Sequence, residues 1–317
     1  MSSSLVKIVT GKASSYLADK IAKSYGKSLG IIKLTNFSDG EFQVSYEETV
    51  RGNEVFIIQS TFMPTENLFE LLLMIDAAKR ASAKSIIGVI PYLAFARQDR
   101  KDKPRVAIGA KLVVNLLKAA GVDRVITMDL HADQIQGFFD IPVDHLFASS
   151  FFIPYIQNLK LDNIVMASPD TGGTKRAAAY ANHLKCDFVM CYKSRKEANK
   201  IDKLLLVGDV NNKNVIIVDD IIDTGGTLVK AAEVMIENGA ASVRAICSHP
   251  LLSGQAYQNI EKSLLTELIV SDTIPLKANQ PKSKITVISC ADLFADVISR
   301  VHNNESISTH YTLNTYT

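Results

Sequence analysis

The sequence lacks the features that mark membrane, secreted and nucleic-acid-binding proteins. Its richest apolar run, Leu68 to Ala78, is interrupted by Glu70 and Asp76, so we expect no membrane span. The formal net charge is only +2 and no Lys/Arg run forms a basic patch, so we expect no nucleic-acid partner. The N-terminus has neither the cationic flank nor the apolar core of a signal peptide, which favours a cytoplasmic protein.

The chain has few cysteines, and their spacing forms no paired motif. The chain has Cys186, Cys191, Cys247 and Cys290, none of them in a C-x-x-C motif. Three of them fall in apolar, strand-like runs and the fourth just follows one. We therefore expect buried, reduced thiols rather than disulfides or a metal site.

What the chain does contain is an alternation of strand and helix patterns in a well-cored composition, 47% hydrophobic and 21% charged over 317 residues. Such alternation predicts parallel sheets with right-handed crossovers, here in two similar doubly wound α/β domains sharing one cleft. The expected strands are 6–9, 31–34, 42–46, 55–59, 86–90, 125–128, 164–167, 187–191, 204–207, 215–218, 243–247 and 285–288. The expected helices are 16–25, 67–81, 110–120, 172–183, 228–238, 254–262 and 293–301, with 285–301 returning to the first domain.

The stretch from Val215 to Thr227 carries the strongest chemical signal. Four apolar β-formers predict a buried strand that stops at Asp219 and Asp220, and the turn that follows leads into a helix. Gly225 and Gly226 let backbone N–H groups approach an anion, and the flanking threonines and the helix N-terminus favour a phosphate. The acids suit sugar hydroxyls. The alternative is a helix cap and an ordinary turn; a Walker loop is excluded, because its spacing and lysine are missing.

Two further acidic segments follow expected strands. Asp129 and His131 would lie on one side of an extended segment, where they suit a divalent metal or a phosphate ligand, unless the histidine is structural. Asp170 precedes a glycine pair and a helix, so it either binds a metal or a ribose hydroxyl or caps that helix.

Two cationic loops complete the set. Residues 97–103 and 193–196 each follow an expected strand. A solvated charged loop is the usual explanation of such runs, but arginine forks at a strand end also clamp polyphosphates. Transfer of a diphosphoryl group needs cations on the transferring phosphates and a fixed nucleophile.

Taken together, these motifs resemble the ribose-phosphate diphosphokinases, also called phosphoribosyl pyrophosphate synthetases, over nearly the whole chain. The landmarks are 37–41, 96–101, 129–132, 134–140, 168–170, 193–195 and 219–227. The resemblance implies two domains of the type I phosphoribosyltransferase kind. An ATP-side domain would span 1–146 with the C-terminal helix 290–317, and a ribose 5-phosphate-binding domain would span 147–289.

The resemblance also implies the reaction of MgATP with ribose 5-phosphate, giving phosphoribosyl diphosphate and AMP, in a homohexamer regulated by phosphate and ADP. Carried over by motif, the ATP-binding residues are Phe37, Asp39, Gly40 and Glu41, which reach a neighbouring subunit's adenine, with Arg97, Gln98, Lys101 and His131. Ribose 5-phosphate would be bound by Arg195, Asp219, Asp220, Asp223, Thr224, Gly225, Gly226 and Thr227. His131 and Asp170 would place Mg²⁺, Lys193 and Arg195 would be catalytic, and Gln136, Ser306 and Ser308 would lie at an allosteric anion site.

Two alternatives share parts of this pattern. A phosphoribosyltransferase would need the 219–227 loop but neither the 97–101 loop nor a second α/β domain. A non-catalytic regulatory subunit of the same fold is expected to have lost the cationic residues, whereas Arg97, Gln98, Lys193 and Arg195 are all present. The chain also departs from many relatives at Pro104, at Gly109 and after Ser308, which concerns loop closure and regulation.

Overall fold

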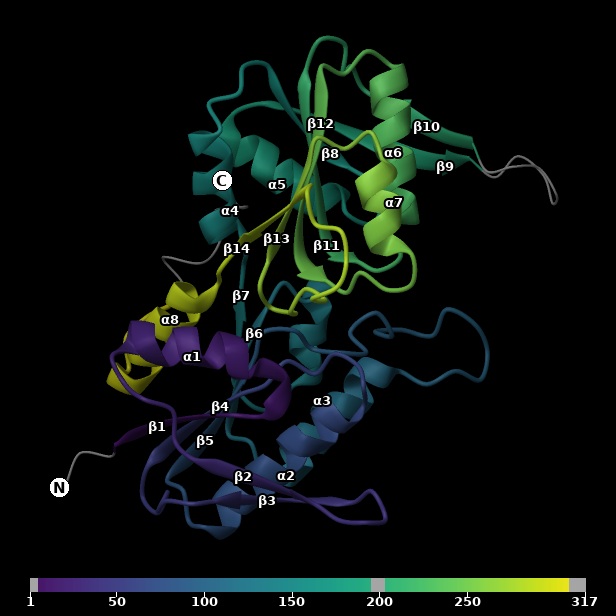
Figure 1. Cartoon of the computed structure of the whole chain (residues 1–317). Helices are drawn as coiled ribbons and strands as arrows, with labels where there is room; N and C mark the ends of the chain where they lie inside the picture. The colour runs from purple at the N-terminus through teal and green to yellow at the C-terminus, as the bar shows by residue number, and fades with distance from the viewer. Residues whose placement is uncertain (1–4, 195–202, 308–317) are drawn as a thin grey trace. The chain divides into compact units, whose positions relative to one another are not determined.

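The computed structural model describes residues 5–194 and 203–307, and these fold into two compact units. One unit contains the residues up to Leu146 together with the helix that follows Cys290, and the other contains Phe147–Ser289. Each unit is built around its own sheet (Figure 1).

The first unit has a five-stranded, fully parallel sheet. Its order is β1 (Val6–Thr10), β4 (Glu54–Ile58), β5 (Ser85–Ile90), β6 (Arg124–Met128) and β7 (Val143–Leu146). A separate antiparallel hairpin pairs β2 (Ile32–Asn36) with β3 (Phe42–Tyr46). The helices are η1 (Lys12–Ser14), α1 (Ser15–Tyr25), α2 (Glu66–Arg80), α3 (Gly109–Ala120), η2 (Asp133–Phe138) and α8 (Ala291–Asn303). Helix α1 packs against α8, and α2 packs against α3.

The second unit has a seven-stranded sheet. Its order is β10 (Lys203–Val207), β9 (Asp187–Ser194), β8 (Ile164–Ser168), β11 (Asn214–Ile222), β12 (Ser242–Pro250), β13 (Glu267–Ser271) and β14 (Ile285–Ile288). The helices are α4 (Ser149–Asn158), α5 (Thr174–Leu184), α6 (Gly226–Glu237) and α7 (Ala256–Lys262). The central strands are buried on both faces: Ile216 and Ile217 of β11, whose side chains point to opposite faces, are 1% and 0% exposed, and Ala245 and Ile246 of β12 are 0% and 1% exposed.

The expected α/β class with parallel sheets is confirmed, with local corrections. Strands β7 and β13 were not predicted. Strand β10 runs antiparallel to β9, so this edge of the second sheet is a hairpin and not a crossover. Strand β14 pairs with β13 of the second unit, so only α8, and not 285–288, returns to the first unit. Strand β11 continues to Ile222, so Asp219 and Asp220 lie inside it rather than after it. Helix α4 was not predicted, because Pro154 lies inside it.

The cysteine prediction is confirmed in part. All four cysteines are free thiols; Cys191, Cys247 and Cys290 are buried, while Cys186 is partly exposed. Within the described ranges, no helix combines the length and apolarity that crossing a membrane requires.

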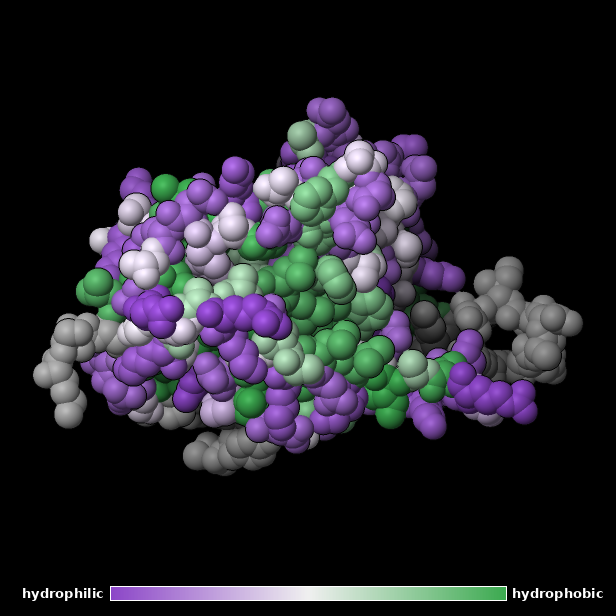
Figure 2. All heavy atoms as spheres, turned by 90° about the horizontal axis from the view of Figure 1, so that it is seen from below, coloured by the Kyte–Doolittle hydropathy of each residue, from purple (hydrophilic) through white to green (hydrophobic). Residues whose placement is uncertain are grey.

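Several large apolar side chains of the first unit remain exposed. Phe69 on α2 is 57% exposed, and Leu112 and Leu116 on α3 are 56% and 40% exposed, on helices that pack together. Figure 2 shows apolar side chains gathered among polar ones on the face seen from below. Exposed apolar groups of this kind mark surfaces that other molecules cover.

Candidate functional site

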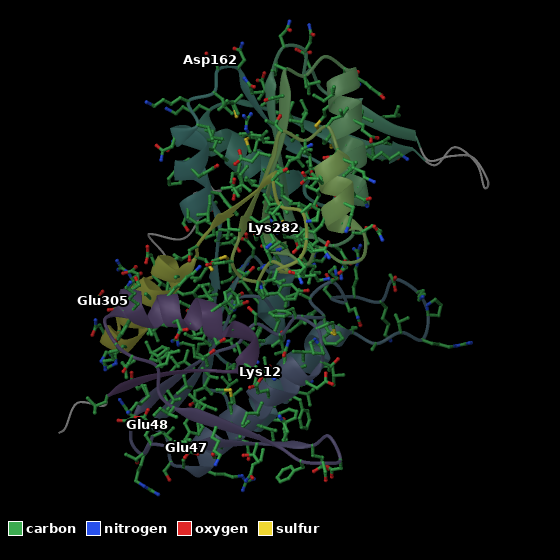
Figure 3. The ribbon with its side chains drawn as sticks, in the orientation of Figure 1. Lys12, Glu47, Glu48, Asp162, Lys282 and Glu305 are labelled. Carbon is green, nitrogen blue, oxygen red and sulfur yellow. The ribbon has the colours of Figure 1, made fainter. Side chains whose placement is uncertain are left out.

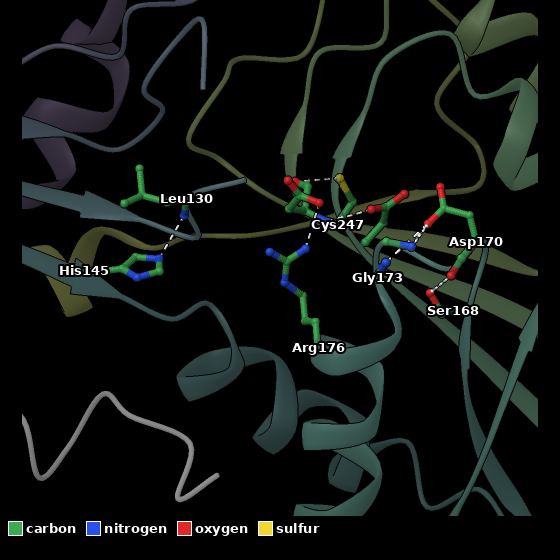
Figure 4. Close-up of polar contacts among 10 residues, drawn as sticks. Leu130, His145, Ser168, Asp170, Gly173, Arg176 and Cys247 are labelled. Atoms are coloured by element: carbon green, nitrogen blue, oxygen red, sulfur yellow. Dashed lines mark hydrogen bonds and ion pairs between the residues drawn. The ribbon is translucent and has the colours of Figure 1, made fainter. Parts of the chain in front are cut away.

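In the second unit, the acidic pair of β11 forms a small network with one arginine. Arg176, the third residue of α5, donates from Nη1 to Oδ1 of Asp220 at 2.7 Å (Figure 4). Both side chains are largely enclosed, 21% and 8% exposed. Asp219 Oδ1 accepts the Asp220 backbone N–H at 2.9 Å. Arg176 therefore holds two acids, one directly and one through its neighbour.

This network sets the protonation of the pair. Desolvation raises the pKa of Asp219 well above its ordinary value, and the charge of Asp220 raises it further, while Arg176 opposes the shift. Carboxyl oxygens at this place can accept hydrogen bonds from vicinal sugar hydroxyls.

The turn after β11 has the form of an anion-binding loop. Gly225 adopts φ 74°, the left-handed region that glycine enters without strain, and α6 begins at Gly226. The carbonyl groups of Asp223 and Thr224 accept hydrogen bonds from Ser253 N–H (2.8 Å) and Asn259 Nδ2 (3.4 Å). The first N–H groups of a helix have no partner within the helix. The turn therefore has the backbone form of an anion-binding loop, and phosphate binding by it with Thr224 and Thr227 stays a prediction.

Strand β12, next to the acids, carries a cysteine that sequence analysis did not assign to the site. Cys247 of β12 pairs in register with Asp219, and its Sγ–H donates to the Asp220 carbonyl at 3.5 Å. Burial raises the pKa of this thiol well above its ordinary value, so it stays protonated and acts as a donor.

Asp170 fits both alternatives that the sequence left open, a residue that orders the start of the helix and a residue that binds a ligand. Its Oδ1 accepts the backbone N–H groups of Gly172 at 2.8 Å and Gly173 at 3.2 Å, so it organises the turn before α5 (Figure 4). Ser168 Oγ donates to the Asp170 carbonyl at 2.6 Å and fixes the other side of the turn. Asp170 is nevertheless exposed, and its negative charge contributes to the raised pKa of Asp219. Asp170 therefore remains available to a ligand near the acidic pair.

In the first unit, the predicted ATP-side residues other than His131 lie on two separate loops. Phe37, Asp39, Gly40 and Glu41 form the tip of the β2–β3 hairpin, closed by Phe37 N–H to Glu41 O at 2.8 Å. Phe37 is 47% exposed although it is aromatic. An exposed aromatic ring is suited to stacking on a base.

The second loop, from Arg97 to Gly109, is tied down at both ends of its cationic part. The Gln98 N–H donates to Phe95 O at 2.9 Å and its carbonyl accepts Ala110 N–H at 3.2 Å. A Cβ on Gly109 would lie 2.6 Å from Gln98 Oε1, so the Gln98 side chain would have to move to admit a larger residue. Gln134 Nε2 donates to Asp99 Oδ2 at 3.1 Å and links the loop to η2. Arg97, Gln98 and Lys101 are exposed on it.

The expected pairing of Asp129 with His131 is wrong. Asp129 has φ 37°, so the chain turns immediately after β6 instead of continuing extended, and the alternation of side chains does not apply. Asp129 is 5% exposed, whereas His131 is an exposed residue. The turn is held by Asp129 N–H to Leu146 O and by Leu130 N–H to His145 Nε2, both at 2.9 Å (Figure 4). Because Nε2 accepts, the proton of neutral His145 is on Nδ1.

The remaining predicted residues are placed only in part. Gln136 is exposed on η2, where its Nε2 donates to Asp133 O at 3.0 Å, and Ser306 O accepts from Arg300 at 3.3 Å. Arg195 and Ser308 lie outside the described residues, as does the side chain of Lys193. Among the described residues, no three His, Cys, Asp or Glu side chains form a metal-binding group.

The fold and these loops define an α/β protein that presents acidic and glycine-rich turns at the carboxyl ends of parallel strands. Residues 6–121 match the model for the N-terminal domain of ribose phosphate pyrophosphokinase, and residues 192–312 match that for the phosphoribosyl synthetase-associated domain.

Full-length relatives agree. The chain is 57% identical to the ribose-phosphate pyrophosphokinase of Porphyromonas gingivalis over 96% of its length and 97% of the relative's. It is 54% identical to that of Wolinella succinogenes, over 95% and 97%. The crystal structure of the phosphoribosylpyrophosphate synthetase from Mycobacterium smegmatis is similar with a TM-score of 0.90 and 39% identity, over 95% of this chain and 99% of the other. The chain belongs to the ribose-phosphate pyrophosphokinase family.

Proposed function

We propose that the protein transfers the β,γ-diphosphoryl group of MgATP to the 1-hydroxyl of ribose 5-phosphate, giving 5-phosphoribosyl 1-diphosphate and AMP for nucleotide synthesis. The observation that carries the proposal is the full-length relationship to ribose-phosphate pyrophosphokinases. The acidic pair of β11 and the turn 223–227 that follows it supply the candidate ribose 5-phosphate site. Acids suit the ribose hydroxyls and the turn suits the 5-phosphate, so the two parts match the two ends of one substrate.

The two units divide the substrates between them. The first, 1–146 with the helix after Cys290, would bind ATP through Phe37, Asp39, Gly40 and Glu41 and through Arg97, Gln98, Lys101 and His131. The second, 147–289, would bind ribose 5-phosphate through Asp219, Asp220 and the 223–227 turn, with Arg195. Lys193 and Arg195 would supply the cationic charge that the transferring diphosphoryl group needs, which makes them the catalytic pair.

The family resemblance implies Mg²⁺ as the cofactor, with His131 of the first unit and Asp170 of the second as its ligands. Mg²⁺ is commonly held by one or two protein ligands together with substrate phosphates rather than by a protein cage. Asp170 is exposed and carries one carboxylate, and His131 is exposed with its imidazole. When bound with the ATP phosphates, Mg²⁺ would neutralise their charge. The protein's own part there is to keep the Asp170 carboxylate in place through Gly172 and Gly173.

Self-association is part of the proposal. The exposed Phe37 at the hairpin tip and the apolar side chains of α2 and α3 are surfaces that a second copy would cover. A homohexamer is the form that the family resemblance implies, in the cytoplasm, with Gln136, Ser306 and Ser308 at a regulatory anion site.

The test is a product assay. The protein, incubated with MgATP and ribose 5-phosphate, is expected to form AMP only when both are present. A phosphoribosyltransferase would instead consume phosphoribosyl diphosphate with a free base, and a regulatory subunit would form neither product. Absence of ribose 5-phosphate-dependent AMP contradicts the proposal.

A further inference from the structure

Arg176 is a residue near the acidic pair to which sequence analysis assigns no role. It is the third residue of α5, and the acid that it binds lies 44 residues further along the chain. Helix α5 packs on both β8 and β11, so the helix presents Arg176 to the strand that carries the acids. A cation aimed at a ligand-binding acid, but belonging to another element, is placed to control that acid.

The contact has the character of a support rather than of a surface ion pair. Its N···O distance is 2.7 Å, and Asp220 is only 8% exposed. Exposed pairs contribute little and fix little, whereas enclosed charge-assisted hydrogen bonds restrict the carboxylate to one orientation. Arginine suits this role because its planar guanidinium loses little side-chain entropy for each hydrogen bond formed.

The restriction extends to the second acid. Asp219 Oδ1 accepts the Asp220 backbone N–H at 2.9 Å, and the charge of Arg176 also acts on Asp219. The Cys247 Sγ–H and the Asp220 carbonyl fix the backbone from the strand side. The acids are thus held from the helix by one side chain and from the sheet by another.

We propose that Arg176 is a positioning residue for ribose 5-phosphate, acting through the Asp220 carboxylate that it orients toward the sugar hydroxyls. This inference rests on the proposed function, since it assigns Arg176 to the ribose half of that reaction. Arg176 is not a catalytic residue in this account, because it acts on the sugar only through Asp220. Its loss is therefore felt in sugar binding and not in ATP binding.

Arg244 offers a matched control in the same sheet. It lies opposite Glu267 on neighbouring strands, and Nε is 3.5 Å from Oε2. The two side chains are 16% and 19% exposed, so this pair is enclosed about as well as Arg176–Asp220. It lies at the start of β12 and β13, away from the ends that carry the acids. Arg244→Gln thus removes an enclosed ion pair without touching the acidic network.

The experiment compares the full-length wild type with Arg176→Gln, Arg176→Lys, Arg244→Gln, Asp220→Asn and the double variant Arg176→Gln/Asp220→Asn. Initial rates of AMP formation give KM for each substrate, and calorimetric titration with ribose 5-phosphate gives its Kd without ATP. Arg176→Gln should raise KM and Kd for ribose 5-phosphate at least about tenfold, because an enclosed acid loses its partner. KM for ATP should stay within about twofold, and Arg176→Lys, which keeps the charge, should recover part of the loss.

A double-mutant cycle decides whether Arg176 acts through Asp220. The double variant should bind ribose 5-phosphate no more weakly than Asp220→Asn alone, and Arg244→Gln should leave both KM values unchanged. The inference is overturned if Arg176→Gln behaves like Arg244→Gln, or if its effect adds fully to that of Asp220→Asn. If Arg176→Gln does not fold, the double variant Arg176→Lys/Asp220→Asn takes its place. The inference then requires that this variant binds ribose 5-phosphate as tightly as Asp220→Asn alone. If the wild type binds ribose 5-phosphate but forms no AMP, the proposed function is contradicted. The inference about Arg176 is then tested by the Kd values alone.

Discussion

Asp219 is a side chain whose chemistry the fold has altered. Desolvation and the neighbouring Asp220 raise its pKa well above the ordinary 3.8, so its proton is held more tightly in the folded chain than in the unfolded one. Stability from this group is complete below the ordinary value and is lost as pH rises toward the raised pKa. The site therefore carries a stability cost at neutral pH, which is common where function requires an enclosed acid.

We predict that Asp219→Asn stabilises the protein, and more so at pH 8 than at pH 5. Asparagine imitates the protonated carboxyl, since its Oδ1 still accepts the Asp220 N–H, but it has no proton to lose. Urea unfolding at the two pH values measures the difference. Asp162, exposed in the loop before β8 (Figure 3), provides the control: Asp162→Asn should show no such pH-dependent gain. Parallel stability–pH profiles for wild type and Asp219→Asn would contradict the prediction.

At this scale the sequence identified the acids, the glycines and the cationic loops, because their residue types alone suggest the chemistry. It could not place Arg176 on Asp220, since nothing local links residues 44 apart. It also misplaced His131 relative to Asp129. The turn there depends on partners in the next strand, Leu146 and His145, which the Asp-Leu-His sequence does not encode.

At the scale of elements, the two glycines of the β11–α6 turn are expected to have different roles, one in the fold and the other in binding a ligand. Gly225 has φ 74°, whereas Gly226 is the first residue of the helix and has no positive φ. A Cβ at either position would meet nothing closer than 3.8 Å. Only Gly225 is therefore required by the backbone.

We predict that Gly225→Ala destabilises the protein by about 1–2 kcal/mol, the cost of a left-handed non-glycine residue. Gly226→Ala should leave stability unchanged or slightly higher, since alanine favours a helix. Gly226→Ala should nevertheless raise KM for ribose 5-phosphate, because its methyl group occupies the space where a phosphate approaches the backbone. Unfolding midpoints and substrate kinetics of the two variants measure both effects. An unaltered KM in Gly226→Ala would show that no ligand approaches this glycine closely.

The strand and helix patterns predicted most elements, and the misses have identifiable causes. Strand β11 continues past its acids because β12 offers partners as far as Pro250 and because Arg176 compensates Asp220. Strand β10 had to be antiparallel, since the connection from Ser194 to Lys203 is shorter than the dozen or so residues that a crossover needs. The sequence pattern did not show that β9 continues to Ser194, and this extension is what shortens the connection. Strand β14 and α8 belong to different units, a division that pattern alone does not locate.

For the whole molecule, the proposal requires that subunits share their sites. The hairpin tip with Phe37 would serve a neighbouring subunit, whereas Lys193 would serve its own. We predict that Phe37→Ala and Lys193→Ala are each strongly impaired, but that co-assembled mixtures regain activity above the sum of the two. In a mixed assembly, some sites receive an intact hairpin from one subunit and an intact lysine from the other.

The control for this complementation is a mixture of Phe37→Ala with Asp39→Ala. Both defects lie on the same hairpin, so every site in that mixture receives a damaged tip and no recovery is expected. Equal recovery in both mixtures, or recovery in neither, would contradict a shared site.

The central claim is that a diphosphoryl group moves as one unit to the sugar. The most direct measurement uses ATP labelled with ³²P at the β-phosphorus, together with ribose 5-phosphate, and follows where the label goes. The account predicts unlabelled AMP and all transferred label in the sugar diphosphate. Labelled ADP with an unlabelled sugar product would show transfer of the γ-phosphoryl group alone, and would contradict the account.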